Sequence, residues 1–425
     1  GGGVGGLALA LALEQRGMKV AVFERDSSFF ARSQGYGFTL QQGGAAVRSL
    51  GLAEAVEAAG CFCSRHVSLD SRGRLLGLHG GRKPQAHGPA ARRNVLLPRQ
   101  SLRALLYSRL KRGTVRWGCE LTSLSSSGDH LQLQLHARRP VRAHVVVGAD
   151  GIRSRVSEAA WGGGGGGEVD IGGRAALQPV GVMVVLGFTQ CEHPLCSSDA
   201  VFELLDGQTR FYGMPFFPSP CRTTMWQLSF SFGLAEAHAL TRGGGPALLD
   251  EARRRCAGWA APVGDLLRHT AACDVSGYPL YDKPMGESRF TPLTGPISGL
   301  CTLVGDSAHP MAPFKGQGAN QALLDALALG RALYSSVLGE AAASDNARRA
   351  SDAELAVRRP RRRCGRGVRE VLSEYEREAC RRAAVKVRSS REAALLLHSP
   401  AALAKASGSL TRSAAARRAL NTEDL

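Results

Sequence analysis

The chain has 425 residues and a formal net charge of +18, with 44% hydrophobic and 6% aromatic residues. This composition is that of a globular protein of two or three domains, because a domain commonly takes about 100 to 200 residues. No uncharged run approaches the roughly 18 apolar residues that a membrane span requires, so the sequence predicts no transmembrane segment.

The opening stretch, GGGVGG, matches G-x-G-x-x-G at Gly1, Gly3 and Gly6, and an apolar helical stretch and a strand ending at Glu24 follow it. The first glycine permits a tight turn, the second lets the backbone approach a pyrophosphate, and the third lets the helix pack closely. The pattern predicts a dinucleotide site in which Glu24 accepts hydrogen bonds from an adenosine ribose. The strand that should precede Gly1 is expected upstream, so the chain is expected to begin inside its cofactor motif.

Two later segments each deliver a carboxylate at the end of an apolar strand. Residues 143–158 place Asp150 and Gly151 in a turn, and residues 299–333 place Asp306 before a proline-rich loop and a long apolar helix. In an open α/β sheet, ligands bind at the carboxyl ends of the strands, so both carboxylates are expected at one site. For Asp150 the alternative is a capping role at the following helix. The small residues of the long helix are expected to pack close to the sheet.

Taken in order, these motifs resemble those of the FAD-dependent aromatic hydroxylases, the flavoprotein monooxygenases typified by p-hydroxybenzoate hydroxylase. GADGIRSRV is similar to the Asp-Gly motif of that family, and LVGDSAHP followed by PFKGQGAN is similar to its Gly-Asp motif. The resemblance covers about residues 1 to 340 and implies FAD as cofactor and NAD(P)H as co-substrate. Arg99 in LPRQSLRALL and Arg32 in ARSQGYGFTLQQGG match arginines that the family places near the cofactor, although a solvent-facing loop is the alternative for Arg32.

The resemblance also implies roles for the last motif. Asp306 would bind ribityl hydroxyls of FAD and Gly305 its pyrophosphate, while Pro313 would border the isoalloxazine. The N–H groups at residues 318–320 would face the flavin O2 and N1, where the dipole of the helix that begins there favours the reduced, anionic flavin. The predicted cofactor-binding residues are Gly1, Gly3, Gly6, Glu24, Arg25, Arg32, Arg99, Asp150, Gly151, Gly305, Asp306, Pro313, Gly316, Gly318, Ala319 and Asn320.

The motif order predicts an α/β fold with a Rossmann-like FAD-binding domain that is split in sequence and lacks its first strand. A second, α+β substrate domain is expected to be built on a β-sheet, because alternating runs such as TTMWQLSFSF indicate strands. The predicted FAD-binding domain comprises residues 1–65, 92–160 and 290–340. The substrate domain comprises 66–91 and 161–289, and a basic helical extension follows at 341–425.

The implied reaction is the hydroxylation of an electron-rich, aromatic small molecule. In the family, NAD(P)H reduces FAD, O₂ adds to give a C4a-hydroperoxide, and the distal oxygen is transferred to the substrate. No catalytic side chain is predicted: Tyr212, His238 and Tyr278 lie in the right region, but core or surface placement is the simpler interpretation. The alternatives are a reductase or dehydrogenase on the same fold, a flavin-dependent halogenase, and a non-enzymatic FAD-binding protein. The W-x-W-x-I-P stretch that is typical of the halogenases is absent from this sequence.

Cysteine and charge patterns bear on partners. The 11 cysteines form no CxxC pair, which favours reduced thiols and a reducing compartment such as the cytoplasm. A metal site at Cys61 and Cys63, or at Cys191 and Cys196, is the alternative, but no second pair follows at zinc-site spacing, so no metal is predicted. The basic run at 358–370 lacks aromatic interleaving and is interpreted as a solvated linker, so no nucleic-acid partner is predicted. Substrate identity, oligomeric state and targeting are not indicated.

Overall fold

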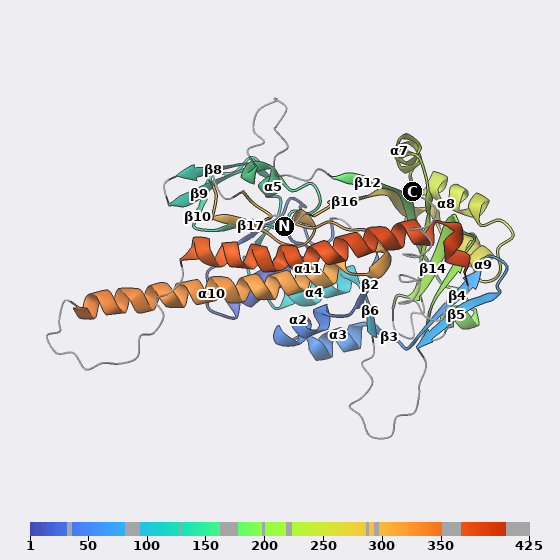
Figure 1. Cartoon of the computed structure of the whole chain (residues 1–425), viewed down its shortest axis with the longest axis horizontal. Coiled ribbons are helices and arrows are strands. Elements are labelled where there is room, and N and C mark those ends of the chain that lie inside the picture. Colours follow the sequence, from blue (N-terminus) through green and yellow to red (C-terminus); the bar gives the residue numbers. More distant parts are fainter. Residues whose placement is uncertain are drawn as a thin grey trace, which may run out of the picture.

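The computed structural model describes residues 1–31, 36–80, 94–127, 129–161, 177–197, 200–217, 223–285, 289–292, 297–350 and 367–404. Two long helices, α10 (Gly318–Ala350) and α11 (Val368–Leu397), lie side by side along the molecule, and a large sheet stands at one end of α11 (Figure 1). The predicted position of Arg32 and most of the basic run at 358–370 lie outside the described residues.

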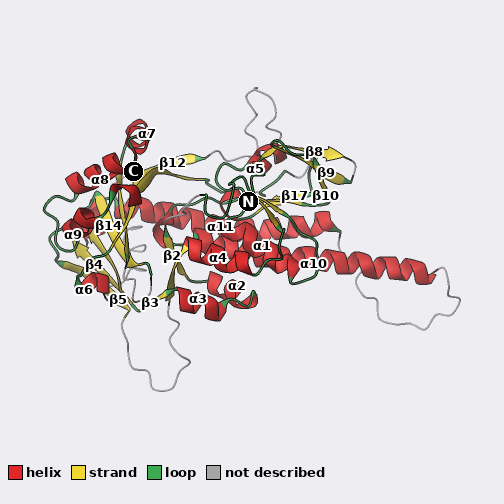
Figure 2. Cartoon of the chain, turned by 180° about the vertical axis from the view of Figure 1, so that it is seen from behind, coloured by secondary structure: helices red, strands yellow, loops and turns green. Residues whose placement is uncertain are grey.

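Helix α1 (Val4–Glu14) is buried almost all round because its sequence is apolar on every side. It lies against α10, and α4 (Arg99–Ser108) contacts it as well (Figure 2). A Cβ added at Gly330 of α10 would lie 3.1 Å from the Cβ of Ala12. The expectation that this small residue packs on the sheet is therefore wrong: it permits close contact between two helices.

Two parallel strand pairs flank the start of the chain. They are β1 (Val22–Phe23) with β7 (Val115–Arg116), and β11 (Val146–Gly148) with β17 (Cys301–Leu303). Gly1 lies between the pairs, because its amino group donates to the carbonyl of Phe23 at 2.8 Å and a Cβ at Gly1 would lie 2.0 Å from the carbonyl oxygen of Ala149. The ends of both pairs therefore meet at the glycine turn. Parallel pairs covered by helices confirm the predicted α/β class.

The largest sheet has seven strands in the order β16-β12-β15-β14-β13-β4-β5, and only β13 and β4 pair in parallel. One face packs on three helices through large side chains such as Phe202, Phe211 and Trp226. The other face borders the cleft described below. The strands are β4 (Arg65–Asp70), β5 (Leu75–Gly80), β12 (Gln178–Thr189), β13 (Ala200–Leu205), β14 (Thr209–Pro215), β15 (Thr224–Ser231) and β16 (Ser276–Asp282); the helices are α7 (Leu234–Arg242), α8 (Gly244–Arg255) and α9 (Val263–His269).

Smaller elements complete the described structure. Two three-stranded sheets are formed by β2 (Gly37–Leu40), β6 (Asn94–Pro98) and β3 (Cys61–Cys63), and by β10 (Val141–Ala143), β9 (His130–Leu135) and β8 (Leu121–Ser127). The remaining helices are α2 (Gly43–Ser49), α3 (Ala53–Ala59), α5 (Arg155–Ala160) and α6 (Pro194–Ser197), with 3-10 turns η1 (Ala272–Asp274), η2 (Gly305–Ser307), η3 (Pro313–Lys315) and η4 (Pro400–Leu403).

Helix α11 connects the two sides of the molecule. The hydroxyl of Tyr375 donates to the carbonyl of Leu303 in β17 at 3.0 Å, and two turns before the end of the helix Arg391 bonds the buried Asp282 of β16 at 2.7 Å. The helix therefore contacts both the parallel strands and the seven-stranded sheet. The proposed domain boundaries stay a prediction. Within the described ranges, no helix is long and apolar enough to cross a membrane.

Candidate functional site

The three predicted motifs open onto one cleft of about 2520 Å³. The cleft runs from the glycine turn at the start of α1 to the inner face of the seven-stranded sheet. The predicted residues that line it are Gly1, Gly3, Gly6, Glu24, Arg25, Arg99, Asp150, Gly151, Gly305, Asp306, Pro313, Gly316, Gly318 and Ala319.

The first glycine turn is fixed from both sides. The Glu24 carboxylate accepts hydrogen bonds from the backbone N–H of Gly2 and, at 3.1 Å, from that of Asp26. On the other side, Nε of the fully buried Arg103 donates to the carbonyl of Gly2 at 2.9 Å. Sequence reasoning missed Arg103, although it lies four residues after Arg99 on the same face of α4, a spacing that could have indicated it.

Arg99 lies between the first glycine turn and the Gly-Asp turn. Its guanidinium donates to the hydroxyl of Tyr36, and one nitrogen lies 3.8 Å from the Cβ position of Gly3. Burial lowers the pKa of Arg99, but neighbouring Tyr36 and Asp306 outweigh burial and raise it. The residue is thus a fixed positive charge that faces the cleft.

The Asp150 carboxylate serves the helix that follows it. It accepts hydrogen bonds from the Ser154 hydroxyl at 2.6 Å, from the Arg155 N–H at 2.8 Å and from the Val156 N–H at 3.3 Å. These bonds satisfy the start of α5, as expected of a carboxylate at a helix N-terminus. The capping alternative for Asp150 is therefore present in the structure, and the residue also borders the cleft.

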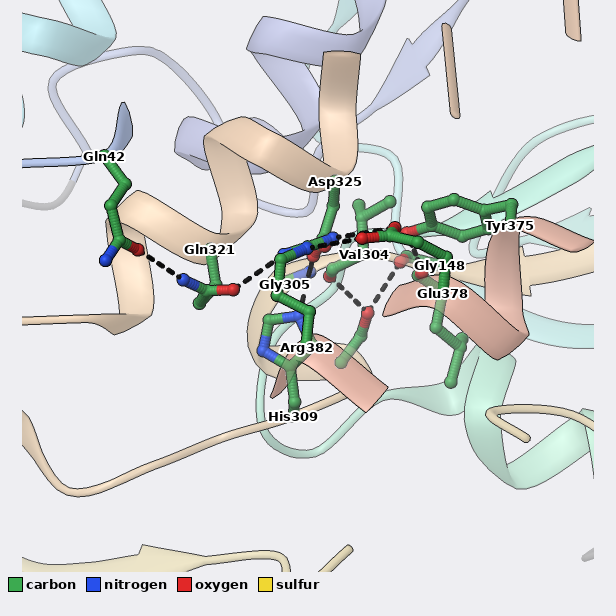
Figure 3. A network of polar contacts seen from close by, with 12 residues as sticks. Gln42, Gly148, Val304, Gly305, His309, Gln321, Asp325, Tyr375, Glu378 and Arg382 are labelled. Carbon is green, nitrogen blue, oxygen red and sulfur yellow. Dashed lines mark hydrogen bonds and ion pairs between the residues drawn. The ribbon is translucent and has the colours of Figure 1, made fainter. Parts of the chain in front are cut away.

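The Gly-Asp turn is held by a buried carboxylate on α10, as Figure 3 shows. Oδ2 of Asp325 accepts the N–H of Gly305 at 2.9 Å and lies 2.7 Å from Nε2 of His309, and Oδ1 accepts from Arg382 of α11 at 2.9 Å. Gly305 has φ of +61°, a conformation that glycine adopts at little cost. The network therefore fixes a turn whose next residue, Asp306, is exposed.

Opposite charges set the protonation of this network. Burial raises the pKa of Asp325, but His309 and Arg382 outweigh burial and hold the pKa below its ordinary value. For His309, burial lowers the pKa while the Asp325 charge raises it, with a net increase. Both shifts favour the charged forms of the pair, a carboxylate and an imidazolium. The sequence did not indicate this network, because Arg382 is 57 residues from Asp325.

Asn320 does not line the cleft. Its fully buried side chain accepts hydrogen bonds from the N–H groups of Gln41 at 2.8 Å and Gly43 at 2.9 Å, and donates to the carbonyls of Thr39 and Gly316. The side chain thus connects β2 and α2 to the start of α10. Only the backbone N–H is left for the predicted contact with a flavin.

The described residues fit a dinucleotide with a flavin ring. A Cβ at Gly6 would lie 2.1 Å from the carbonyl oxygen of Gly1, so any side chain at this position would clash with the turn. The starts of two helices, α1 and α10, line the cleft and favour anionic groups. Among the described residues, no cluster of three His, Cys, Asp or Glu could hold a metal ion, and the cysteines there are free thiols.

The three candidates for a substrate base differ in position. Tyr212 lies on the inner face of the seven-stranded sheet and lines the cleft. His238 of α7 shares a hydrogen bond of 3.0 Å with the hydroxyl of Tyr281, and Tyr278 is 38% exposed. All three line the cleft, and Tyr212 lies in a row of polar side chains on the cleft face of the sheet.

Comparisons with known proteins agree with this geometry. Residues 1–218 and 297–358 match the family described as the FAD binding domain. The chain is 28% identical over 336 residues to an aurachin C monooxygenase/isomerase of Stigmatella aurantiaca, covering 78% of this chain and 79% of that protein. It is 27% identical over 343 residues to the 3-amino-4-hydroxybenzoate 2-monooxygenase PtnB3 of Streptomyces platensis, covering 77% of each.

Solved structures show the same fold. HpxO of Klebsiella pneumoniae, complexed with FAD and uric acid, matches with a TM-score of 0.73 and 19% identity over 99% of this chain and 95% of that one. The 2,6-dihydroxypyridine-3-hydroxylase of Arthrobacter nicotinovorans matches with a TM-score of 0.72 and 17% identity over 97% and 94%. The predicted fold, cofactor FAD and oxidoreductase class are confirmed, and the chain belongs to the FAD binding domain family, alongside FAD-dependent monooxygenases.

Proposed function

We propose that the chain is a monooxygenase that uses FAD, NAD(P)H and O₂ to hydroxylate an electron-rich aromatic small molecule. One observation carries this proposal: three turns that are far apart in sequence open onto one cleft, and polar side chains of the seven-stranded sheet line the same cleft. Such a cleft has room for a dinucleotide along the turns and a ring-shaped substrate against the sheet.

Charged residues and helix starts would hold the cofactor. Glu24 would accept the ribose hydroxyls after exchanging its bond to Gly2, and Arg99 would face the pyrophosphate together with the start of α1. Asp306 would accept ribityl hydroxyls, since its Oδ1 lies 3.7 Å from the Cβ position of Gly318 at the start of α10. When bound, FAD supplies the electron transfer and O₂ activation that no side chain provides.

The polypeptide would contribute orientation and exclusion of water. The loop at Pro313 and Phe314 carries an apolar wall, and the Phe314 ring lies 5.2 Å from that of His398 and 5.7 Å from the Arg210 guanidinium. Burial lowers the pKa of His398 to about 4, so the His398 ring adds no charge to this wall at neutral pH. A dry wall beside the reacting ring limits loss of activated oxygen to water.

Oxygen labelling tests the proposal. With NAD(P)H, ¹⁸O₂ and a panel of phenols, indoles and quinols, a true substrate should accelerate NAD(P)H oxidation, lower peroxide release and acquire one ¹⁸O atom. Because a reductase or dehydrogenase also binds FAD, the same assay is run without O₂. Sustained anaerobic turnover that yields a product without label would assign the chain to the reductase class instead.

A further inference from the structure

Four side chains form a polar patch on the cleft face of the seven-stranded sheet: Glu203, Arg210, Tyr212 and Gln227. Tyr212 pairs across the strands with Glu203 on one side and with Gln227 on the other. Directly opposed side chains stand about 5 Å apart, so these three form one row. Arg210 lies two residues before Tyr212 on β14 and therefore points to the same face.

The two charges of the patch neutralise each other. Nε of Arg210 donates to Oε2 of Glu203 at 2.8 Å, and the two residues are 5% and 3% exposed. Ser68 donates to the other carboxylate oxygen at 2.7 Å, and His66 lies 3.5 Å from it. The Arg210 guanidinium also lies 4.6 Å from the centroid of the Tyr212 ring. Neither charge is therefore left over to pair with an ionic ligand.

The side-chain amide of Gln227 is unsatisfied at its nitrogen within the described part of the chain. It is 9% exposed, and its buried Nε2 has no hydrogen-bond partner among the described residues. Its cross-strand neighbour on β12 is Leu186, and Met214 and Met225 form the next row on the same face. Buried amides are rarely unsatisfied in folded proteins, so this nitrogen calls for an acceptor other than the described residues.

We propose that the patch is the subsite that recognises the substrate, and that it selects an uncharged planar aromatic compound presenting a carbonyl, hydroxyl oxygen or ring nitrogen to Gln227. This inference rests on the proposed function. The methionines and Leu186 supply an apolar surface for the ring, and the Tyr212 hydroxyl supplies a second neutral hydrogen-bonding group. A carboxylate-bearing aromatic would face a buried cation that Glu203 already neutralises, so the subsite discriminates against it.

Binding of matched ligands to the FAD-loaded protein tests the charge argument without turnover. The probes are 4-hydroxybenzamide against 4-hydroxybenzoate, and 4-quinolone against its 2-carboxylate, measured by calorimetry and by the change in flavin absorbance. Each neutral probe should bind at least tenfold more tightly than its acid. Glu203→Gln leaves the Arg210 charge uncompensated and should reverse this preference.

A second variant tests Gln227 itself. Gln227→Leu removes an unsatisfied amide from apolar surroundings, so the melting temperature and FAD content should stay the same or rise, while the neutral probes lose tenfold or more in affinity. The matched control is Gln208→Leu, an exposed glutamine in the β13–β14 turn of the same sheet, which should change neither. A purely structural Gln227 would instead lower the melting temperature and leave ligand affinity intact.

The outcomes separate the two proposals. Preference of the wild type for the acids, unchanged affinity in Gln227→Leu, or failure of every neutral probe to bind a yellow, FAD-loaded protein would overturn the subsite and leave the monooxygenase proposal standing. A protein that takes up no FAD would overturn the proposed function itself.

Discussion

Asp306 is the exposed carboxylate of an otherwise buried turn, because the residues on both sides of it, 301–305 and 307–310, are buried. The turn is fixed below by Asp325 and beside it by Ser307, whose hydroxyl donates to the carbonyl of Gly148 at 2.6 Å. An exposed carboxylate on a fixed turn needs little reorganisation to accept a ligand hydroxyl, which replaces water on the carboxylate. The position therefore suits cofactor binding more than stability.

Replacing Asp306 should thus weaken FAD binding and leave the fold intact. A hydrogen bond to a charged group contributes about 1.5 to 3 kcal/mol, so Asp306→Ala should raise the dissociation constant of FAD about 10- to 100-fold. Flavin absorbance after gel filtration and the melting temperature of the apoprotein measure the two effects. Asp250→Asn, an exposed carboxylate on α8, is the control. FAD retention equal to wild type would remove Asp306 from the site.

The His309–Asp325 ion pair predicts a pH dependence. Because the folded pKa of His309 is raised, its contribution to stability is complete below about pH 6.5 and is lost as pH rises through the folded value. The lowered pKa of Asp325 gives a contribution that is present above about pH 3.9 and lost as pH falls through its folded value. The network therefore stabilises most between these limits.

Melting temperatures between pH 6 and pH 9 check this sign. The wild type should lose stability as pH rises, and His309→Gln should be less stable at pH 6 but flatter across the range. His136→Gln, at an exposed position, should keep the wild-type slope. Identical slopes for wild type and His309→Gln would show that the imidazole does not titrate in this range.

Arg382 of helix α11 supports the cofactor side of the molecule. Arg382 of α11 donates to two residues of α10, Asp325 at 2.9 Å and Gln321 at 2.6 Å. It also bonds Glu378, one turn earlier on α11, at 3.0 Å, so it connects the two helices. Asp325 is fully buried, so removal of the cation leaves a carboxylate whose remaining partners are His309 and Gly305. The helix is therefore part of the site's support.

Arg382→Gln should destabilise the protein by about 1.5 to 3 kcal/mol, because the buried Asp325 loses one of its two cationic partners and the hydrogen bond to it. Arg382→Lys should recover only part of the lost stability. It keeps the positive charge, but one ammonium cannot reproduce the two directed bonds of the guanidinium to Gln321 and Asp325. Urea denaturation measures both. Arg381→Gln, the exposed neighbour on the same helix, is the control. A cost for Arg382→Gln no larger than that of the control would mean that solvent replaces the arginine.

The sequence predicted the parts of the site that are local in the chain. Glycine spacing, strand ends and the start of α10 are each set by a few consecutive residues, and the structure brings them to one cleft. Arg382 and Gln227 could not be predicted, because each acquires its role from a segment far away in sequence, whereas the spacing from Arg99 on α4 could have indicated Arg103. The strand predicted to end at Glu24 ends at Phe23, and only Val22 and Phe23 pair with β7, since strand length depends on the partner strand.

At the scale of the whole molecule, α11 couples the cofactor side to the substrate sheet. One part of the helix bonds the Gly-Asp support through Arg382, and its later part holds the fully buried Asp282 of β16 through a two-pronged contact with Arg391, at 2.7 and 2.9 Å. The Asp282 hydrogen bond raises the pKa of Arg391, so the arginine stays charged. FAD that stabilises the turns should therefore also stabilise the sheet.

This coupling predicts how FAD affects unfolding. At 100 times its dissociation constant, FAD should stabilise the wild type by about 2.7 kcal/mol, and flavin release and loss of circular dichroism should share one midpoint. Arg391→Leu leaves Asp282 buried without its cation, so the sheet should unfold first and loss of circular dichroism should begin at a lower denaturant concentration than flavin release. Arg388→Leu, on the same helix, should keep one midpoint. The Arg391→Leu variant removes the contact between Arg391 of α11 and Asp282 of β16. If flavin release and loss of circular dichroism still coincide in this variant, other contacts couple the cofactor side to the sheet.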